Sequence, residues 1–184
     1  MNTHRPGTTA FTLIELLIVV AIIGILAAIA VPNFLNAQIR AKVARTYADI
    51  KAQGTALEMY LLDNNAYPMS FNGQSPYQFP RLHELTTPVG YMASLPQDPF
   101  MPAENTYRYY HYVSTTDEHT WLVHNWNVFN PTKPLPDWVK WKLRAVGPNG
   151  MHEHALAYEA SNGLVSDGDV VAWGPGGAGP HDSY

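Results

Sequence analysis

The amino-terminal part of the chain contains its longest apolar stretch. Leu16 to Val31 is a run of sixteen residues without a polar side chain. The apolar character begins at Phe11, and one acid, Glu15, lies between Phe11 and this run. As a helix that rises about 1.5 Å per residue, residues 11–31 span about 31 Å, which matches the roughly 30 Å hydrocarbon core of a bilayer. The pattern therefore predicts a membrane-spanning helix.

Two other interpretations of this stretch fit it less well. A buried core helix would have to be enclosed on every face, which a chain of 184 residues rarely achieves. A cleaved signal peptide has an apolar region of about 7–15 residues and a small-residue cleavage site. Ala28-Ile29-Ala30 resembles such a site, but the apolar run is longer, has Glu15 within it and continues into a further helical pattern.

After Pro32 the pattern changes to that of an amphipathic helix. Apolar positions hold one face at helical spacing, and they are Ile39, Val43, Ile50, Gly54, Leu57 and Leu61. Turn-forming residues and a proline end the pattern at residues 63–68. We predict one long helix from residue 11 to about residue 62, with a membrane-spanning part at 11–33 and an amphipathic part at 34–63. Pro32 removes one helical hydrogen bond, so we expect a kink or a loosened turn there.

Residues 64–184 are predicted to form a separate, loop-rich head. A short helix is expected at residues 81–85 and a proline-bounded turn at residues 95–100. Polar and apolar residues then alternate at 107–113, 122–128 and 139–145, which predicts three antiparallel strands packed on the helix. Lys140, Lys142 and Arg144 are expected to point away from that packed face. The predicted fold class is α+β, a long helix on a small antiparallel sheet with a loop-rich C-terminal region.

Composition and charge exclude several classes of function. Eleven Lys and Arg against 15 Asp and Glu give a net charge of −4, and no basic patch suited to nucleic acid is present. The absence of cysteine excludes disulfides, thiolate metal sites and a thiol nucleophile. His152 and His154 flank Glu153, but no zinc-protease spacing accompanies them, and no serine-nucleophile or phosphate-loop motif occurs. We therefore predict a protein that is not an enzyme.

Glu15 needs a partner that the nearby sequence does not supply. A carboxylate costs about 2.5–3.5 kcal/mol at the centre of a membrane helix and less towards its ends. No Lys or Arg lies within two helical turns of it. A cut just before Phe11 would create an α-amino group four residues away, and this amine could neutralise Glu15 in the same chain or in a packed neighbour. The unpaired acid thus indicates processing and assembly.

The segment from Ala10 to Leu16, AFTLIEL, follows a short polar leader with a basic residue and resembles the type IV prepilin signature. The resemblance implies cleavage between Ala10 and Phe11 by a prepilin peptidase, N-methylation of Phe11, and packing of the apolar helices in a filament core. It also implies that the helix between Gly24 and Pro32 melts on assembly. The family usually has Gly where this chain has Ala10, so we expect slower cleavage.

The head narrows the resemblance to the major pseudopilins of type II secretion, protein G of the general secretion pathway. The matching segments are LDNNAYP, YMASLPQDPF, WKLRAVGPNG and SNGLVSDGDVV. The family implies a single-pass inner-membrane protein with leader 1–10 removed and its head, residues 64–184, in the periplasm. Cations counted alone favour the opposite orientation, since Arg40, Lys42 and Arg45 follow the span.

The resemblance also implies partners and a mechanical role. The subunit would polymerise with itself into a pseudopilus, together with minor pseudopilins and an inner-membrane assembly platform, and so drive protein export across the outer membrane. A type IV pilin used for adhesion, motility or DNA uptake is one alternative. A signal-anchored periplasmic enzyme or binding domain is an alternative of another class.

Calcium is the one cofactor that the resemblance implies, bound by oxygens of the C-terminal loops. Asn149 stands where the family has Asp, while Ser166, Asp167 and Asp169 resemble the later acidic cluster. Calcium takes six to eight oxygen ligands, and a glycine-rich loop exposes its carbonyls. An ordinary tight turn is the alternative for the Asp-Gly pair at 167–168, and the stretch 152–158 is inserted between the two ligand groups.

Overall fold

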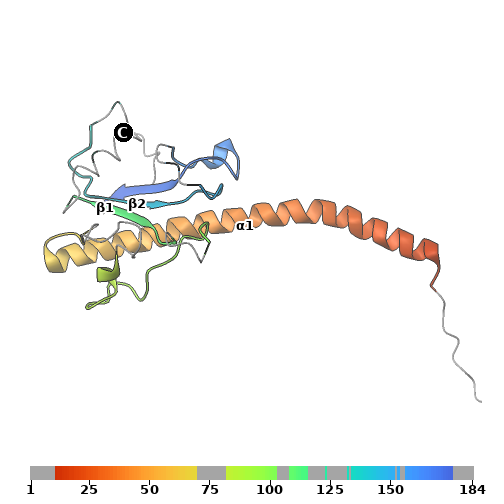
Figure 1. Ribbon diagram of the computed structural model, residues 1–184, viewed down its shortest axis with the longest axis horizontal. Coiled ribbons are helices and arrows are strands. Elements are labelled where there is room, and N and C mark those ends of the chain that lie inside the picture. The colour runs from red at the N-terminus through yellow and green to blue at the C-terminus, as the bar shows by residue number, and fades with distance from the viewer. Residues whose placement is uncertain are drawn as a thin grey trace, which may run out of the picture. The chain divides into compact units, whose positions relative to one another are not determined.

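The computed structural model describes residues 11–69, 82–102, 108–115, 123, 132, 134–151, 153 and 156–175. Its elements are helix α1 (Leu13–Asn64), the 3-10 helix η1 (His83–Leu85), strands β1 (His111–Ser114) and β2 (Trp141–Ala145), the 3-10 helix η2 (Ala160–Asn162) and strand β3 (Val170–Gly174). One long apolar-to-amphipathic helix and a small antiparallel sheet confirm the predicted α+β class (Figure 1).

The chain divides into two compact units, residues 1–38 and 39–184. The described part of the first unit is the amino-terminal half of α1, in which large apolar side chains stand exposed at nearly every position, as with Leu13, Ile22 and Ile29 at 81%, 52% and 61% exposure. This stretch is long and apolar enough to cross a membrane. The helix passes through Pro32 without a break.

In the second unit, α1 packs one face and exposes the other. Its buried positions recur at helical spacing, and they are Thr46, Ile50, Gln53, Gly54, Ala56 and Leu57. The two polar members bond to their own helix: Thr46 Oγ1 donates to the Lys42 carbonyl at 3.0 Å and Gln53 Nε2 to the Asp49 carbonyl at 3.4 Å. Because of these local hydrogen bonds, the two polar side chains can be buried without leaving a donor unsatisfied. The helix ends at Asn64, close to the predicted end.

The three strands form one antiparallel sheet in the order β1-β2-β3. β2 lies within the strand predicted at 139–145, and β1 overlaps the strand predicted at 107–113 but ends one residue later, at Ser114. The segment predicted at 122–128 lies, apart from Val123, outside the described residues. β3 was missed by sequence reasoning, which assigned its residues to the C-terminal loops. Its sequence VVAWG is buried at all five positions, so the alternation that marks a half-exposed strand is absent.

One face of the sheet packs against α1 and forms the larger core. Trp141 and Leu143 of β2 lie on this face with Tyr112 of β1, and they join Ile50 and Leu57 of the helix in one cluster. Leu143 and Leu57 are completely buried. The apolar face predicted for residues 139–145 is thus confirmed for Trp141, Leu143 and Ala145.

The opposite face of the sheet is also buried, which corrects the expectation for two basic residues. Lys142 and Arg144 were expected to point into solvent, but they are 0% and 6% exposed, while Lys140 is exposed as predicted. A second apolar cluster lies on the sheet here, with Leu135 and Trp138 packed against it. Alternation within one strand shows which residues share a face, but it does not show that a distant segment covers the other face.

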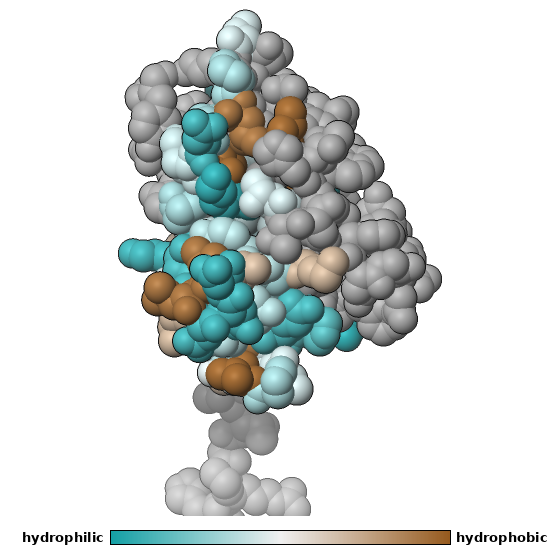
Figure 2. All heavy atoms as spheres, turned by 90° about the vertical axis from the view of Figure 1, so that its left-hand side faces the viewer, coloured by the Kyte–Doolittle hydropathy of each residue, from teal (hydrophilic) through white to brown (hydrophobic). Residues whose placement is uncertain are grey.

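Exposed apolar side chains are more dispersed in the second unit than in the first. Among the coloured residues in Figure 2, most are hydrophilic, and the hydrophobic ones form small, separate areas. Scattered apolar side chains are normal on a protein surface. Within the part of the chain that the structure describes, exposed apolar side chains are therefore concentrated in the amino-terminal half of α1.

Trp141 fixes the spacing between the helix and the sheet. A Cβ atom added at Gly54 would lie 3.0 Å from the Trp141 ring, and one added at Gly174 would lie 1.9 Å from it. The ring nitrogen donates to Glu58 Oε1 of α1 at 2.9 Å, and the Tyr67 hydroxyl donates to the same carboxylate at 3.1 Å. The indole ring therefore occupies the space that two glycines leave open and is oriented by a helix carboxylate.

We expect Gly54→Val to destabilise the second unit by about 1–3 kcal/mol, because the added methyl groups collide with a packed indole ring. Thr55→Val is the matched control, since Thr55 is the next helix residue and is exposed. Chemical denaturation of the full chain in detergent micelles, followed by tryptophan fluorescence, measures both. Equal stability of the two variants would contradict the close packing of the Trp141 ring against Gly54.

Candidate functional site

The amino-terminal end of α1 is organised by Thr12 and Glu15. The Thr12 backbone N–H and hydroxyl donate to Glu15 Oε2 at 2.8 and 2.6 Å, and the Glu15 N–H donates to Thr12 Oγ1 at 3.3 Å. This reciprocal arrangement is a capping box, which satisfies donors that the first helical turn leaves free. The predicted cleavage partner Ala10 lies outside the described residues, and Phe11 is 69% exposed.

The sequence carries the signal for this capping box. The spacing Thr-x-x-Glu at residues 12–15 is its signature. It changes the interpretation of Glu15, which has partners within its own chain even before any amine is created at Phe11. If Glu15 paired with the amine of a neighbouring chain, it would therefore exchange its hydrogen bonds to Thr12 for a bond to that amine.

Gly24 and Pro32, the two residues expected to bound a melting segment, lie in continuous helix. A Cβ added at Gly24 would meet nothing within 4 Å among the described residues. No packing contact in this structure requires glycine at that position. Its helix propensity, about 1 kcal/mol below that of Ala, remains as a local weakness of the helix.

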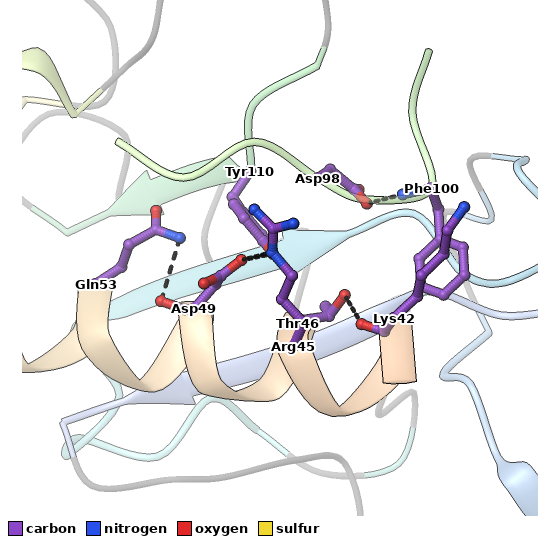
Figure 3. Close-up of polar contacts among 8 residues, drawn as sticks. All are labelled: Lys42, Arg45, Thr46, Asp49, Gln53, Asp98, Phe100 and Tyr110. Carbon is purple, nitrogen blue, oxygen red and sulfur yellow. Dashed lines mark hydrogen bonds and ion pairs between the residues drawn. The ribbon is translucent and has the colours of Figure 1, made fainter. Parts of the chain in front are cut away.

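The proline-bounded turn at residues 95–100 is fixed by a buried carboxylate. Asp98, 4% exposed, accepts hydrogen bonds from the Phe100 N–H at 2.9 Å and from the Val146 N–H at 2.7 Å. Burial raises the pKa of Asp98 to about 6 despite these two bonds, with a smaller contribution from Asp49. Figure 3 shows this turn above the polar side chains of α1.

The helix presents a small polar cluster to this turn. The Tyr110 hydroxyl donates to Asp49 Oδ2 at 3.0 Å, and the same oxygen lies 3.5 Å from Arg45 Nε. Burial, and the Asp49 charge after it, raise the pKa of Tyr110. The Lys42 amine lies 5.6 Å from the centroid of the Phe100 ring (Figure 3). The turn and the helix are thus joined by polar contacts as well as by packing.

The C-terminal loops bring two of the sequence-predicted residues together. Asn149 Nδ2 donates to Asp167 Oδ1 at 3.1 Å and to Glu153 Oε1 at 3.2 Å. Its own side-chain oxygen accepts from the Met151 N–H at 3.1 Å. Glu153 belongs to the inserted stretch, and sequence reasoning did not place it at this site. Nothing in its local pattern showed that a loop would fold back onto Asn149.

The other two predicted residues have different partners. Asp169, fully buried, lies 3.2 Å from Arg144 Nη1 through Oδ2 and accepts from the Glu153 N–H through Oδ1 at 3.1 Å. Burial raises the pKa of Asp169 to about 6, although the Arg144 charge acts in the opposite direction. Ser166 Oγ donates to the Glu159 carbonyl at 3.0 Å. These two residues are therefore held in place by other groups.

The donor set of these loops consists of oxygens, which suits calcium rather than a transition metal. Within the described part of the chain, however, no three His, Asp or Glu side chains converge as a metal cluster. A bound calcium ion would therefore depend on loop carbonyls as well as on Asp167 and Glu153. The Asn149 oxygen would join them after the amide turns over, because its nitrogen now faces both carboxylates and its oxygen accepts from the Met151 N–H.

The backbone holds the loop that follows β2 in contact with the segment that precedes β3. A Cβ added at Gly147 would lie 1.9 Å from the Gly168 carbonyl oxygen, so glycine is required for this approach. Gly168 itself has a φ of +115° and packs against Ala157. The loop that begins at Val146 is thus fixed against the segment that carries Asp167.

Comparison with known proteins supports the family resemblance over residues 6–120. A family model described as the prokaryotic N-terminal methylation motif matches residues 6–31, and one described as type II secretion system protein G matches residues 33–120. Type II secretion system core protein G of Pseudomonas aeruginosa is 42% identical over 111 residues, which cover 58% of this chain and 75% of that protein. The chain belongs to the type II secretion system core protein G family.

Other relatives give the same result. Core protein G of Escherichia coli is 39% identical over 94 residues, covering 49% of this chain and 65% of that protein. Core protein G of Vibrio cholerae is 38% identical over 108 residues, covering 55% and 69%. No solved structure matches the chain significantly. The core protein G family model ends at residue 120, so the C-terminal loops lie beyond it.

We expect Arg144→Met to destabilise the second unit by about 3–5 kcal/mol at neutral pH, because it removes the ion-pair partner of the buried Asp169 carboxylate. Arg45→Met is the matched control. Arg45 also pairs with an aspartate, Asp49, but its side chain is 64% exposed, and such a pair contributes about 1 kcal/mol or less. Denaturant titration of both full-length variants measures the difference. Similar losses in the two would contradict the importance of the buried pair.

Proposed function

We propose that this chain is the major pseudopilin subunit of a type II secretion system, which polymerises through its amino-terminal helix into a periplasmic pseudopilus. Growth of that filament would drive folded substrate proteins through an outer-membrane channel. The observation that carries the proposal is the amino-terminal half of α1, whose apolar side chains are exposed and lie within the matched methylation motif, residues 6–31. The match to core protein G over residues 33–120 favours a pseudopilin over a type IV pilin.

The exposed helix explains why the subunit must move between two apolar environments. Such a surface is unfavourable in water at roughly 25 cal/mol per Å². Before assembly the bilayer would cover it, in a single-pass inner-membrane protein with its head in the periplasm. After assembly, the helices of other subunits would cover it. Polymerisation thus exchanges lipid contacts for protein contacts without exposing this surface to water.

Processing would prepare the helix for that exchange. A prepilin peptidase would remove residues 1–10 after Ala10, and the new amine of Phe11 would be N-methylated. The match to the methylation motif at residues 6–31 supports this step. Glu15 would then pair with the Phe11 amine of a neighbouring subunit and give up some of its bonds to Thr12. In an apolar filament core, a charge-neutralising pair selects one axial stagger between helices.

The other partners follow from the same role. The filament would contain further copies of this chain and minor pseudopilins, and it would be built by an inner-membrane assembly platform. The chain's contribution is mechanical, with no catalytic step assigned to its residues.

We also propose that the C-terminal loops bind calcium. Asp167, Glu153 and the Asn149 oxygen would act as side-chain ligands with nearby loop carbonyls. Ser166 and Asp169 lie at the same loops, where Asp169 holds the Glu153 backbone through its bond to the Glu153 N–H. An amide at position 149 in place of a carboxylate lowers the ligand charge, which reduces affinity. Calcium would tie the two loops together and stiffen the head.

Replacing Glu15 tests the assembly mechanism. In the producing bacterium, Glu15→Ala is expected to insert into the membrane normally but to form few or no filaments, because the Phe11 amine loses its partner. Asp63→Ala, an exposed carboxylate at the far end of α1, serves as the control. Intact mass shows whether each protein begins with N-methylated Phe11, and electron microscopy with cross-linking measures the filaments. Efficient filaments from Glu15→Ala, or an uncut wild-type chain, would refute the mechanism.

Calcium addition tests the loop site. Calcium at about 100 times its dissociation constant should stabilise the full chain by about 2.7 kcal/mol and raise the melting temperature by a few degrees. A chelator should reverse the effect, Asp167→Asn should abolish it, and Asp63→Asn should retain it. Thermal melts in detergent micelles measure each case. A wild-type melting temperature unchanged by calcium would refute the site.

A further inference from the structure

Asp98 connects two parts of the head that are far apart in the sequence. One oxygen holds its own turn through the Phe100 N–H, and the other holds the Val146 N–H, 48 residues later. The Asp98 backbone also pairs with the chain before β1, because its N–H donates to the Arg108 carbonyl at 2.8 Å. Val146 directly follows the last residue of β2 and begins the loop that carries Asn149.

A carboxylate at this position is costly, so its presence needs a reason other than stability. Asp98 is buried, and Asp49 on the facing helix carries the same charge. The nearby cation is Lys42, whose effect on the pKa is smaller than that of burial. What the carboxylate provides is two separate acceptor oxygens, aimed at two N–H groups from different segments. A neutral amide of the same shape has one acceptor and would leave one N–H without a partner.

Short backbone contacts connect Val146 to the loops that carry Asn149 and Asp167. Gly147 follows at once and touches the Gly168 carbonyl, next to Asp167. The Gly150 N–H donates to the Gly147 carbonyl at 3.0 Å, which closes a tight turn around Asn149. A displacement of the Val146 backbone would therefore also displace Asn149 relative to Asp167.

We propose that Asp98 is a positioning residue, which fixes the start of the 146–151 loop and thereby sets the geometry of the Asn149–Asp167 pair for a bound divalent cation. The part that concerns the cation rests on the proposed calcium function, whereas the anchoring of Val146 does not. Through Asp98 the loops would also be linked to α1, because the turn at 95–100 lies against the helix face that bears Lys42 and Asp49 (Figure 3).

The hydrogen bond between the Asp98 carboxylate and the Val146 N–H, here called the anchor, should respond to pH in a defined direction. The groups that act electrostatically on Asp98 are Lys42 and Asp49 of α1, and Tyr110 is bonded to Asp49. With the pKa raised from 3.8 to about 6, the native state binds a proton more tightly than the unfolded chain between these values. The contribution of Asp98 to the free energy of unfolding therefore falls as pH rises through this window. Protonation also changes the bond to Val146 from a charge-assisted to a weaker neutral one.

The test uses the full chain, labelled with ¹⁵N-valine, in detergent micelles. In the wild type, the Val146 amide resonance should shift between about pH 5 and pH 7, following the carboxyl that it contacts. In Asp98→Asn, which preserves shape, that shift should vanish. Asp49→Asn is the matched control, because it removes a neighbouring carboxylate that has no bond to Val146. The control should retain the shift, with a lower midpoint because a like charge has been removed.

Calcium titration of the same samples tests the second half of the proposal. Asp98→Asn should weaken calcium binding about tenfold, within the usual range for coupled sites, whereas Asp49→Asn should change it less than twofold. A Val146 resonance unmoved by pH and by Asp98→Asn would overturn the anchor. Normal calcium affinity in Asp98→Asn would overturn the coupling. If the wild type does not bind calcium but Val146 still titrates, the calcium proposal and the coupling fail, and the anchor stands.

Discussion

The head depends on the contact between β2 and the second half of α1. A three-stranded sheet has too little apolar area to be stable alone, so it needs a second layer to cover one face. Trp141 provides the centre of that contact by filling the space above Gly54 and beside Gly174, and Glu58 orients it through a hydrogen bond. The helix that would anchor the subunit in the membrane is thus also a structural layer of the head.

Burial of charge is the second constraint. The outer face of the sheet contains Lys142 and Arg144, and Asp169 balances part of their charge. Burial lowers the pKa of Lys142, and its amine lies 5.3 Å from the Trp173 ring centroid. Buried ions of this kind add little net stability, but they tolerate few alternative arrangements. They therefore fix the start of β3, and with it the segment that carries Asp167.

Two carboxylates of the chain, one in each unit, differ in their surroundings. Glu15 is exposed and bonded to Thr12, so it can exchange partners when a neighbouring amine arrives. Asp98 is buried and bonded to two backbone amides, so it holds its position. The difference follows from solvent access. An exposed carboxylate loses little free energy when it changes partners, because water can replace a lost hydrogen bond. When a buried carboxylate leaves its partners, the N–H groups that it accepted from are left without a hydrogen bond.

The sequence by itself determined the long helix, its division into an apolar and an amphipathic half, the α+β class and the family, because periodicity and short motifs are local. It also placed Trp141 and Leu143 on the helix-facing side of β2. It did not reveal β3, the burial of Lys142 and Arg144, or the approach of Glu153 to Asn149. These depend on which distant segments cover a surface, and only the tertiary structure decided them. A strand that is buried on both faces has no alternating pattern of polar and apolar residues. A buried charged residue cannot be distinguished from a surface residue in the sequence, because its partner in the fold is not known.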